Sequence, residues 1–131
     1  AHVLHRNQAL TCLSLKSTGL GPHGVTAIAP ALGECNGLQR LNLAHNRMKA
    51  EGAKALAGVP WGMFAVLQYL EVQDNQFGAT GVRRLAEALA PAARMRLAHV
   101  RMGGNSVGSR RDGEKVKNDV RRALGQCITQ W

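Results

Sequence analysis

An aliphatic pattern recurs four times along this chain. Each copy has an apolar residue, another three positions later, a third two positions after that, and Thr or Asn three positions further on. The copies are Leu10–Thr18, Leu38–Asn46, Leu67–Asn75 and Leu97–Asn105, and their first leucines lie 28, 29 and 30 residues apart. A fixed period in this range is typical of stacked repeats, each of which buries its apolar side against its neighbours. The pattern therefore predicts one repeat array.

The second copy indicates how one repeat folds. Leu41 and Leu43 alternate as in a strand, which we expect from about Arg40 to Ala44. Asn46 follows in the turn, where its amide can bond backbone groups. Beyond the turn, a helix face is predicted by the three-and-four spacing of Ala53, Leu56 and Ala57. Stacked copies would place short parallel strands on a concave side and helices on a convex side.

One stretch carries a family resemblance. Residues 67–89 read L-x-x-L-x-L-x-x-N-x-L-G-x-x-G-V-x-x-L-A-x-A-L, with Val72 and Phe77 at two of the Leu places. This string resembles the leucine-rich repeat of the ribonuclease-inhibitor-like subtype, and the resemblance covers roughly residues 4–107. It implies an α/β right-handed solenoid. Such arrays also occur in the Ran GTPase-activating protein and in tropomodulin-like actin regulators, so the resemblance implies a mode of binding but no single substrate.

We expect a single domain fragment over residues 1–131. Residues 1–9 align with the end of a preceding repeat, and further repeats start near residues 10, 38, 67 and 97. The first repeat would then leave its strand edge and its leucines (Leu4, Leu13 and Leu15) uncovered. Because an open edge invites pairing, we expect further repeats or a partner to cover it.

The last repeat departs from the pattern. Arg111 stands where the earlier repeats place a glycine such as Gly81. A capping helix is predicted over about residues 114–128, with an apolar stripe of Val116, Val120, Leu124 and Ile128.

Residues that alternate with the strand leucines should point to the concave, solvated side. Three columns result: Cys12, Arg40, Tyr69 and His99; then Ser14, Asn42, Glu71 and Arg101; then Lys16, Ala44, Gln73 and Gly103. These positions are either ordinary solvated sheet residues or a protein-binding face, with Tyr69 and Arg40 as the best anchors because tyrosine and arginine dominate interface energetics. Glu71 and Arg101 would form a cross-strand pair. The candidate partner-binding residues are Arg40, Asn42, Tyr69, Glu71, Gln73, His99 and Arg101.

The net charge of +9 is concentrated at the C-terminal end. Residues 94–131 hold nine of the 17 Lys and Arg residues but only three of the eight Asp and Glu residues. The favoured interpretation is the charged back of the capping helix, and the alternative is a docking face for an acidic protein, RNA or lipid. Base recognition is disfavoured because aromatic residues are nearly missing from this end. The candidate basic patch is Arg110, Arg111, Lys115, Lys117, Arg121 and Arg122.

Trp61, in the return to the third strand, also has two interpretations. We favour packing beneath its own helix, and the alternative is an exposed patch shared with Met63 that would bind a partner.

The remaining composition narrows the function. No apolar run is long enough to span a membrane. Three cysteines at unrelated spacings favour a reducing compartment, most simply the cytoplasm. No phosphate-binding loop or catalytic triad is recognisable, so we predict no enzyme activity, cofactor or metal.

The sequence thus favours a protein–protein interaction or scaffold module within a larger intracellular protein or assembly. Two alternatives stay open: a regulatory module of the Ran GTPase-activator type, and a subunit that binds RNA or an acidic partner through its basic C-terminal end.

Overall fold

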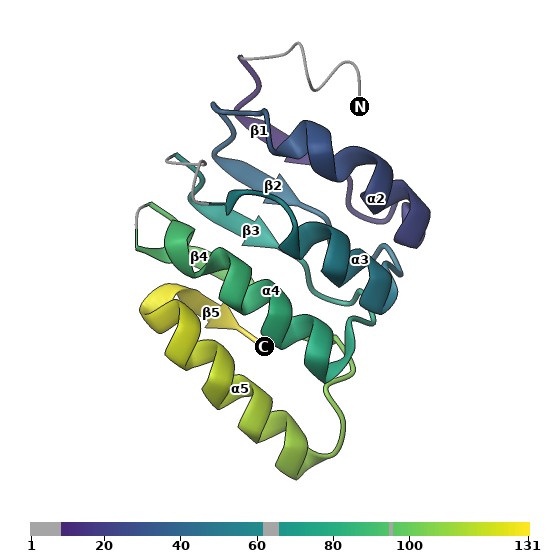
Figure 1. Cartoon of the computed structure of the whole chain (residues 1–131), viewed down its shortest axis with the longest axis vertical. Helices are drawn as coiled ribbons and strands as arrows, with labels where there is room; N and C mark the ends of the chain where they lie inside the picture. Colours follow the sequence, from purple (N-terminus) through teal and green to yellow (C-terminus); the bar gives the residue numbers. More distant parts are fainter. Residues whose placement is uncertain (1–8, 62–65, 95) are drawn as a thin grey trace.

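The computed structural model describes residues 9–61, 66–94 and 96–131, in which short strands alternate with helices. Within these ranges, five parallel strands form one sheet in chain order, and the helices line up along one side of it (Figure 1). The fold is therefore the α/β solenoid that the sequence predicts. Its elements are β1 (Cys12–Ser14), α2 (Gly21–Leu32), β2 (Arg40–Asn42), α3 (Lys49–Ala57), β3 (Tyr69–Glu71), α4 (Gly78–Ala93), β4 (His99–Arg101), α5 (Arg110–Leu124), the 3-10 helix η2 (Gly125–Cys127) and β5 (Ile128–Gln130).

An aliphatic spine lies between the sheet and the helices. Leu41, Leu70 and Val100 occupy equivalent places in successive strands, and at most 1% of each is exposed. Burying one such side chain contributes about 1.5–3 kcal/mol. At the other end Leu13 and Leu15 are only half-buried, because among the described residues β1 has a neighbouring strand on one side only. Leu4 lies outside the described residues.

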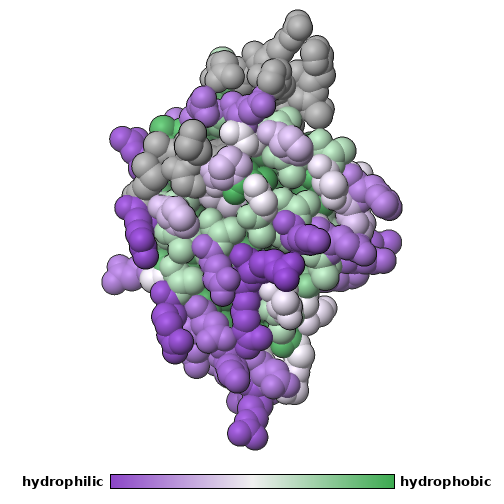
Figure 2. All heavy atoms as spheres, viewed as in Figure 1, coloured by the Kyte–Doolittle hydropathy of each residue, from purple (hydrophilic) through white to green (hydrophobic). Residues whose placement is uncertain are grey.

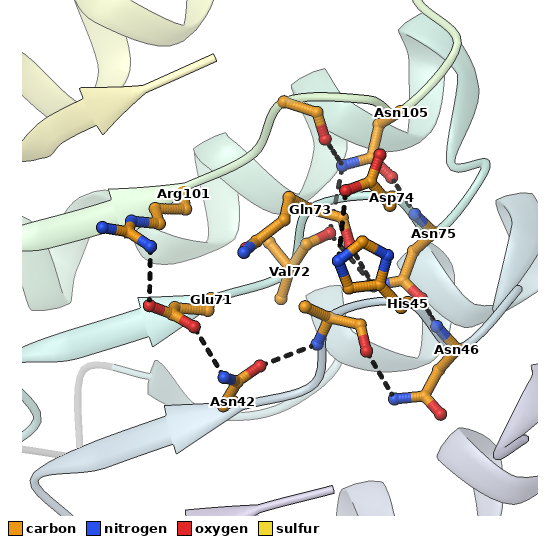
Figure 3. Close-up of polar contacts among 12 residues, drawn as sticks. Asn42, His45, Asn46, Glu71, Val72, Gln73, Asp74, Asn75, Arg101 and Asn105 are labelled. Carbon is orange, nitrogen blue, oxygen red and sulfur yellow. Dashed lines mark hydrogen bonds and ion pairs between the residues drawn. The ribbon is translucent and has the colours of Figure 1, made fainter. Parts of the chain in front are cut away.

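The turn after each inner strand is held by a buried asparagine (Figure 3). Asn46, Asn75 and Asn105 are at most 2% exposed. Asn75 Nδ2 donates to the carbonyl oxygen of Val72 in its own turn at 3.0 Å and to that of Leu43 in the preceding turn at 2.9 Å. Its Oδ1 accepts from the Asn46 backbone N–H at 2.8 Å. Each asparagine thus joins two successive turns, which confirms the role predicted for Asn46.

The first copy has Thr18 at this place. Its hydroxyl donates to the carbonyl oxygen of Leu15 in its own turn at 2.8 Å, and its backbone N–H donates to Asn46 Oδ1 at 3.1 Å. Within the described residues, the side-chain amides that join successive turns, which we call the asparagine ladder, begin at Asn46. Thr18 cannot extend this ladder, because a hydroxyl lacks the two amide N–H donors with which each asparagine bonds carbonyl oxygens of two turns.

A buried or half-buried glycine near the start of each helix lets neighbouring helices or turns approach closely. A Cβ atom at Gly81 would lie 2.9 Å from the Cβ of Ala53 on α3, closer than two such atoms pack. The last repeat keeps this feature, contrary to the sequence alignment with Arg111. Gly113 is the fourth residue of α5, and its Cβ would lie 3.3 Å from Cγ2 of Val107. The alignment missed it because two extra residues precede α5. The equivalent glycines of α2 and α3 are Gly24 and Gly52.

Two elements differ from their predicted bounds. The second strand ends at Asn42 and not at Ala44, because the turn begins there: the Ala44 N–H donates to Asn42 Oδ1 at 3.0 Å. The last helix begins at Arg110, four residues before the predicted start, because Ser109 caps it by accepting from the Asp112 N–H at 3.2 Å.

That helix also ends earlier than predicted. Gly125 follows it with φ of 60°, and residues 128–130, the first of which was expected in the helix, form β5 beside β4. The predicted apolar face is otherwise present: Val116, Val120 and Leu124 are at most 3% exposed, and α5 packs on α4.

The favoured interpretation of Trp61 is confirmed. Its side chain is 1% exposed, and its Nε1–H donates to the carbonyl oxygen of Leu56, near the end of α3, at 2.7 Å. Met63 lies outside the described residues.

Candidate protein-binding face

The first predicted column forms a continuous stack of side chains. The guanidinium of Arg40 lies 4.4 Å from the ring centroid of Tyr69, and the ring of His99 stacks on Tyr69 with centroids 4.7 Å apart and 4° between the ring planes. Strands β2 and β4 flank β3, so Arg40 and His99 approach Tyr69 from opposite sides. The ring separation matches the spacing of neighbouring strands, about 4.8 Å. An exposed cation–π contact contributes about 0.5–1 kcal/mol, which holds Tyr69 in place.

The second column forms a polar chain across three strands (Figure 3). Asn42 Nδ2 donates to Glu71 Oε2 at 2.6 Å, and Glu71 Oε1 pairs with an Nη atom of Arg101 at 3.3 Å. The predicted Glu71–Arg101 pair is therefore present. Its side chains are 30% and 42% exposed, so the pair contributes at most about 1 kcal/mol. Its main effect is to orient the carboxylate and the guanidinium.

The third column does not continue as a surface row. Ala44 is fully buried, contrary to its predicted place on the concave side, because the chain has already turned inward there. Gly103 lies beneath the backbone of Trp131, and a Cβ atom there would collide with it. Gln73 is half-buried between these two positions. The contacts within the first two columns thus involve six of the seven predicted residues, and the Gln73 side chain takes part in neither column.

The structure adds a pair that the sequence prediction missed. His45 Nε2 lies 3.5 Å from Asp74 Oδ2, and the two side chains are 44% and 46% exposed (Figure 3). Both residues directly precede a ladder asparagine and have left-handed backbone, with φ of 57° and 56°. Their shared repeat position was the signal that could have revealed this pair.

Two shallow hollows flank the third strand. One, of about 410 Å³, lies over the first three strands and includes Cys12, Ser14 and Arg40 in its lining. The other, of about 430 Å³, lies over β3 and β4 and is lined by Tyr69, Leu70, Glu71, His99 and Arg101. Tyr69 and Glu71 line both hollows, so they form the ridge between them.

Comparison with known proteins identifies the repeats. A sequence profile described as leucine-rich repeat matches residues 6–29, 34–57 and 65–86, which together make up more than half of the chain. The chain belongs to the leucine-rich repeat family. Among curated proteins, no sequence matches significantly.

A solved structure with a similar fold is leiomodin-1 actin-binding site 2. It superposes with a TM-score of 0.77 at 15% sequence identity, over 98% of this chain and 73% of the leiomodin chain. At this identity the likeness shows the fold alone, and the ribonuclease-inhibitor-like subtype stays a prediction.

The basic patch of this leucine-rich repeat chain lies on α5, at the end of the array opposite β1 (Figure 1). Five of its predicted members are exposed and Lys117 is half-buried. Lys117 Nζ pairs with Glu114 at 3.1 Å, and Arg121 donates to Asn118 Oδ1 at 3.2 Å. The exposed members are Arg110, Arg111, Lys115, Arg121 and Arg122.

The three cysteines differ in exposure. Cys12 is exposed on the concave face, whereas Cys35 and Cys127 are buried. The Cys127 Sγ–H donates to the carbonyl oxygen of Leu97 at 2.8 Å. Burial raises the pKa of the Cys35 and Cys127 thiols above its usual value, because the apolar surroundings disfavour the thiolate. Both buried thiols are therefore poor nucleophiles in the folded state.

Across the described ranges, no cluster of three or more histidine, cysteine or acidic side chains is arranged to hold a metal ion. No helix in the described part of the chain is long and apolar enough to cross a membrane.

Proposed function

We propose that this leucine-rich repeat chain is a non-enzymatic module that binds a protein partner through its concave face. The observation that carries the proposal is the stack of Arg40, Tyr69 and His99. These side chains are already ordered by their contacts with one another, so a partner would immobilise little additional side-chain freedom. Tyrosine and arginine are also the residue types that most often dominate interface energetics.

The two hollows favour a partner that inserts side chains on either side of the Tyr69–Glu71 ridge. Because the centres of the hollows lie about one and a half strand spacings apart, the inserted groups would be separated by roughly 7 Å. The Glu71 carboxylate and the Arg101 guanidinium are both partly exposed, so each could form a hydrogen bond or ion pair with a polar group of the partner in place of their mutual contact. Such a partner would present mixed polar and apolar side chains.

The test uses the variants Tyr69→Ala and Arg40→Ala, with Arg84→Ala on the exposed face of α4 as the matched control. Purified monomeric actin is a defined first probe, because the leiomodin domain of similar fold is named as an actin-binding site. Proteins captured from cell extract are the second probe.

We expect both concave variants to lose at least about tenfold in affinity for the captured partner, and the control to bind like the wild-type chain. If the wild-type chain and all three variants capture the same proteins with equal affinity, the concave face is not the binding surface. Circular dichroism checks that each variant keeps its fold, as expected for side chains that are partly exposed.

The GTPase-activating alternative stays a prediction. It requires that a partner GTPase hydrolyse GTP faster in the presence of the chain, and the same concave variants would show whether Arg40 contributes. The RNA-binding alternative is tested together with the basic patch below.

We also propose an intracellular, reducing location, most simply the cytoplasm. The support is the odd number and unrelated spacings of the three cysteines, of which Cys12 is exposed. Imaging of the tagged protein in its own cells tests this.

A further inference from the structure

The outward face of α5 carries a row of three exposed cations that form no ion pair among the described residues. Arg111, Lys115 and Arg122 are all exposed and follow each other at helical spacings of four and seven residues. They therefore lie on one side of the helix, opposite the buried stripe of Val116 and Val120. We call these three residues the α5 basic row. Figure 2 shows hydrophilic side chains gathered at the end of the molecule where α5 lies.

The acids of α5 are engaged elsewhere. Asp119 pairs with Arg83 of α4 at 2.8 Å, and Glu114 pairs with Lys117 at 3.1 Å. Asp112 accepts from the Ser109 hydroxyl at 2.6 Å at the start of the helix. Among the described residues, by contrast, the α5 basic row makes no ion pair. Like charges on one helix face repel each other, and an opposite charge from a partner would relieve this repulsion.

The other helices do not show such a row. The exposed positions of α2 carry no Asp, Glu, Lys or Arg. On α3 the exposed Lys54 is accompanied by Glu51, and on α4 the exposed Arg84 is accompanied by Glu87. Among the described residues, α5 is thus the helix on which three exposed cations line up along one face, with its exposed acids Asp112 and Glu114 already bonded to Ser109 and Lys117.

We propose that the α5 basic row binds an acidic helical segment of a second protein partner, at a surface separate from the concave face. With a rise of 1.5 Å per residue, the three cations stand about 6 Å and about 10 Å apart along the helix axis. Carboxylates at the same helical spacings on a partner helix would face them one to one. Arg111 and Arg122 can each hold a carboxylate in a bidentate contact.

A membrane or a nucleic acid fits this surface less well. The apolar stripe of α5 is buried against α4, so no apolar face is left to enter a bilayer. Lipid-binding clusters typically hold four to eight basic residues, more than this row supplies. The row also has no aromatic side chain on which a base could stack.

The test is a titration of the isotope-labelled chain, followed by amide chemical shifts. The probe is a synthetic helical peptide whose three glutamates have the spacings of the α5 basic row, and its control is the same peptide with glutamines. We expect the glutamate peptide to shift amides of residues 110–124, and to bind more weakly at about 200 mM than at about 50 mM salt. The glutamine peptide should produce no shifts there.

Two triple variants make the test decisive. Arg111→Gln with Lys115→Gln and Arg122→Gln should weaken binding at least about fivefold. The matched control removes the same number and kinds of charge from exposed positions elsewhere, through Arg47→Gln, Lys54→Gln and Arg84→Gln, and should bind within about twofold of the wild-type chain. Equal losses in both variants would show attraction to net charge alone and overturn the proposal.

Two further outcomes would also overturn it. One is a set of shifts confined to residues outside α5. The other is tighter binding of a single-stranded RNA or of phosphatidylserine vesicles through the same three side chains, which would assign the row to a nucleic acid or a membrane.

Discussion

Removing the central ladder asparagine should destabilise the array severely. In Asn75→Ala, the backbone N–H of Asn46 loses its acceptor. The carbonyl oxygen of Leu43 still accepts from the side-chain amide of Asn46, and that of Val72 still accepts from the side-chain amide of Asn105. A buried, unsatisfied N–H costs about 1–3 kcal/mol, and each lost hydrogen bond contributes about 1 kcal/mol. We therefore expect the free energy of unfolding to fall by about 3 kcal/mol, a large part of the stability of a typical domain.

The assay is urea unfolding, followed both by circular dichroism and by tryptophan fluorescence. If the two unfolding curves coincide, the chain unfolds in a single transition. Thr18→Ala is the matched control. The Thr18 hydroxyl bonds the carbonyl oxygen of Leu15 and Asn46 Oδ1, but Thr18 is exposed and water can replace these contacts, so this change should cost less than about 1 kcal/mol. A loss below about 1 kcal/mol for Asn75→Ala, or an equal loss for both variants, would refute the reasoning.

The variant Asn75→Asp separates the donor from the acceptor role. Its carboxylate would still accept from Asn46 but would face the carbonyl oxygens of Val72 and Leu43. Burial and these oxygens would raise the pKa of the introduced carboxyl above its unfolded value of about 3.9. A raised folded-state pKa means that the variant is most stable in acid and loses stability as the pH rises above about 4. A stability that does not change from pH 4 to pH 7 would contradict the assigned donor role.

Three other variants or treatments test the rest of the framework. Lys49→Gly should raise the free energy of unfolding by up to about 1 kcal/mol, because Lys49 has left-handed backbone (φ of 58°) that glycine adopts without strain, as Gly78 does at the equivalent place in the next repeat (φ of 74°). The urea midpoint measures this change, and an unchanged midpoint would contradict the prediction. Gly81→Ala should cost about 1–3 kcal/mol in the same assay, because its Cβ would press on Ala53; a neutral change would show that α3 and α4 can separate freely. In the native chain a thiol reagent should modify Cys12 quickly and the other two cysteines only on unfolding, and rapid reaction of all three would contradict their burial.

The repeated pattern predicted most of the fold because the same register holds in every copy. The leucine spacing located the buried spine, and the register placed Arg40, Tyr69 and His99 in one column, as the structure has them. The prediction failed for Ala44, where the strand ends and the chain turns inward. A period-two pattern cannot locate that end, because the turn continues to bury alternate side chains.

The C-terminal end was harder to predict. Two extra residues before α5 shifted the repeat register, so the alignment matched Arg111 to Gly81 in place of Gly113. The residues of β5 do not follow the leucine pattern by which the other strands were recognised. The strand forms because Gly125, with φ of 60°, ends the helix and returns the chain toward β4. The available signal was Gly125 directly after Leu124, because glycine commonly ends a helix.

The ladder and the concave face are linked by geometry. The asparagines join the turns that follow neighbouring strands, and Tyr69 and His99 stack at 4.7 Å, close to the strand spacing of about 4.8 Å that backbone pairing sets. We therefore expect the order of the concave face to depend in part on the buried asparagines, which do not lie on that face. It follows that a ladder variant that remains folded should weaken binding at the concave face, because looser turns would break the stack. The α5 basic row depends only on the spacing within one helix, so the same variant should leave its binding unchanged.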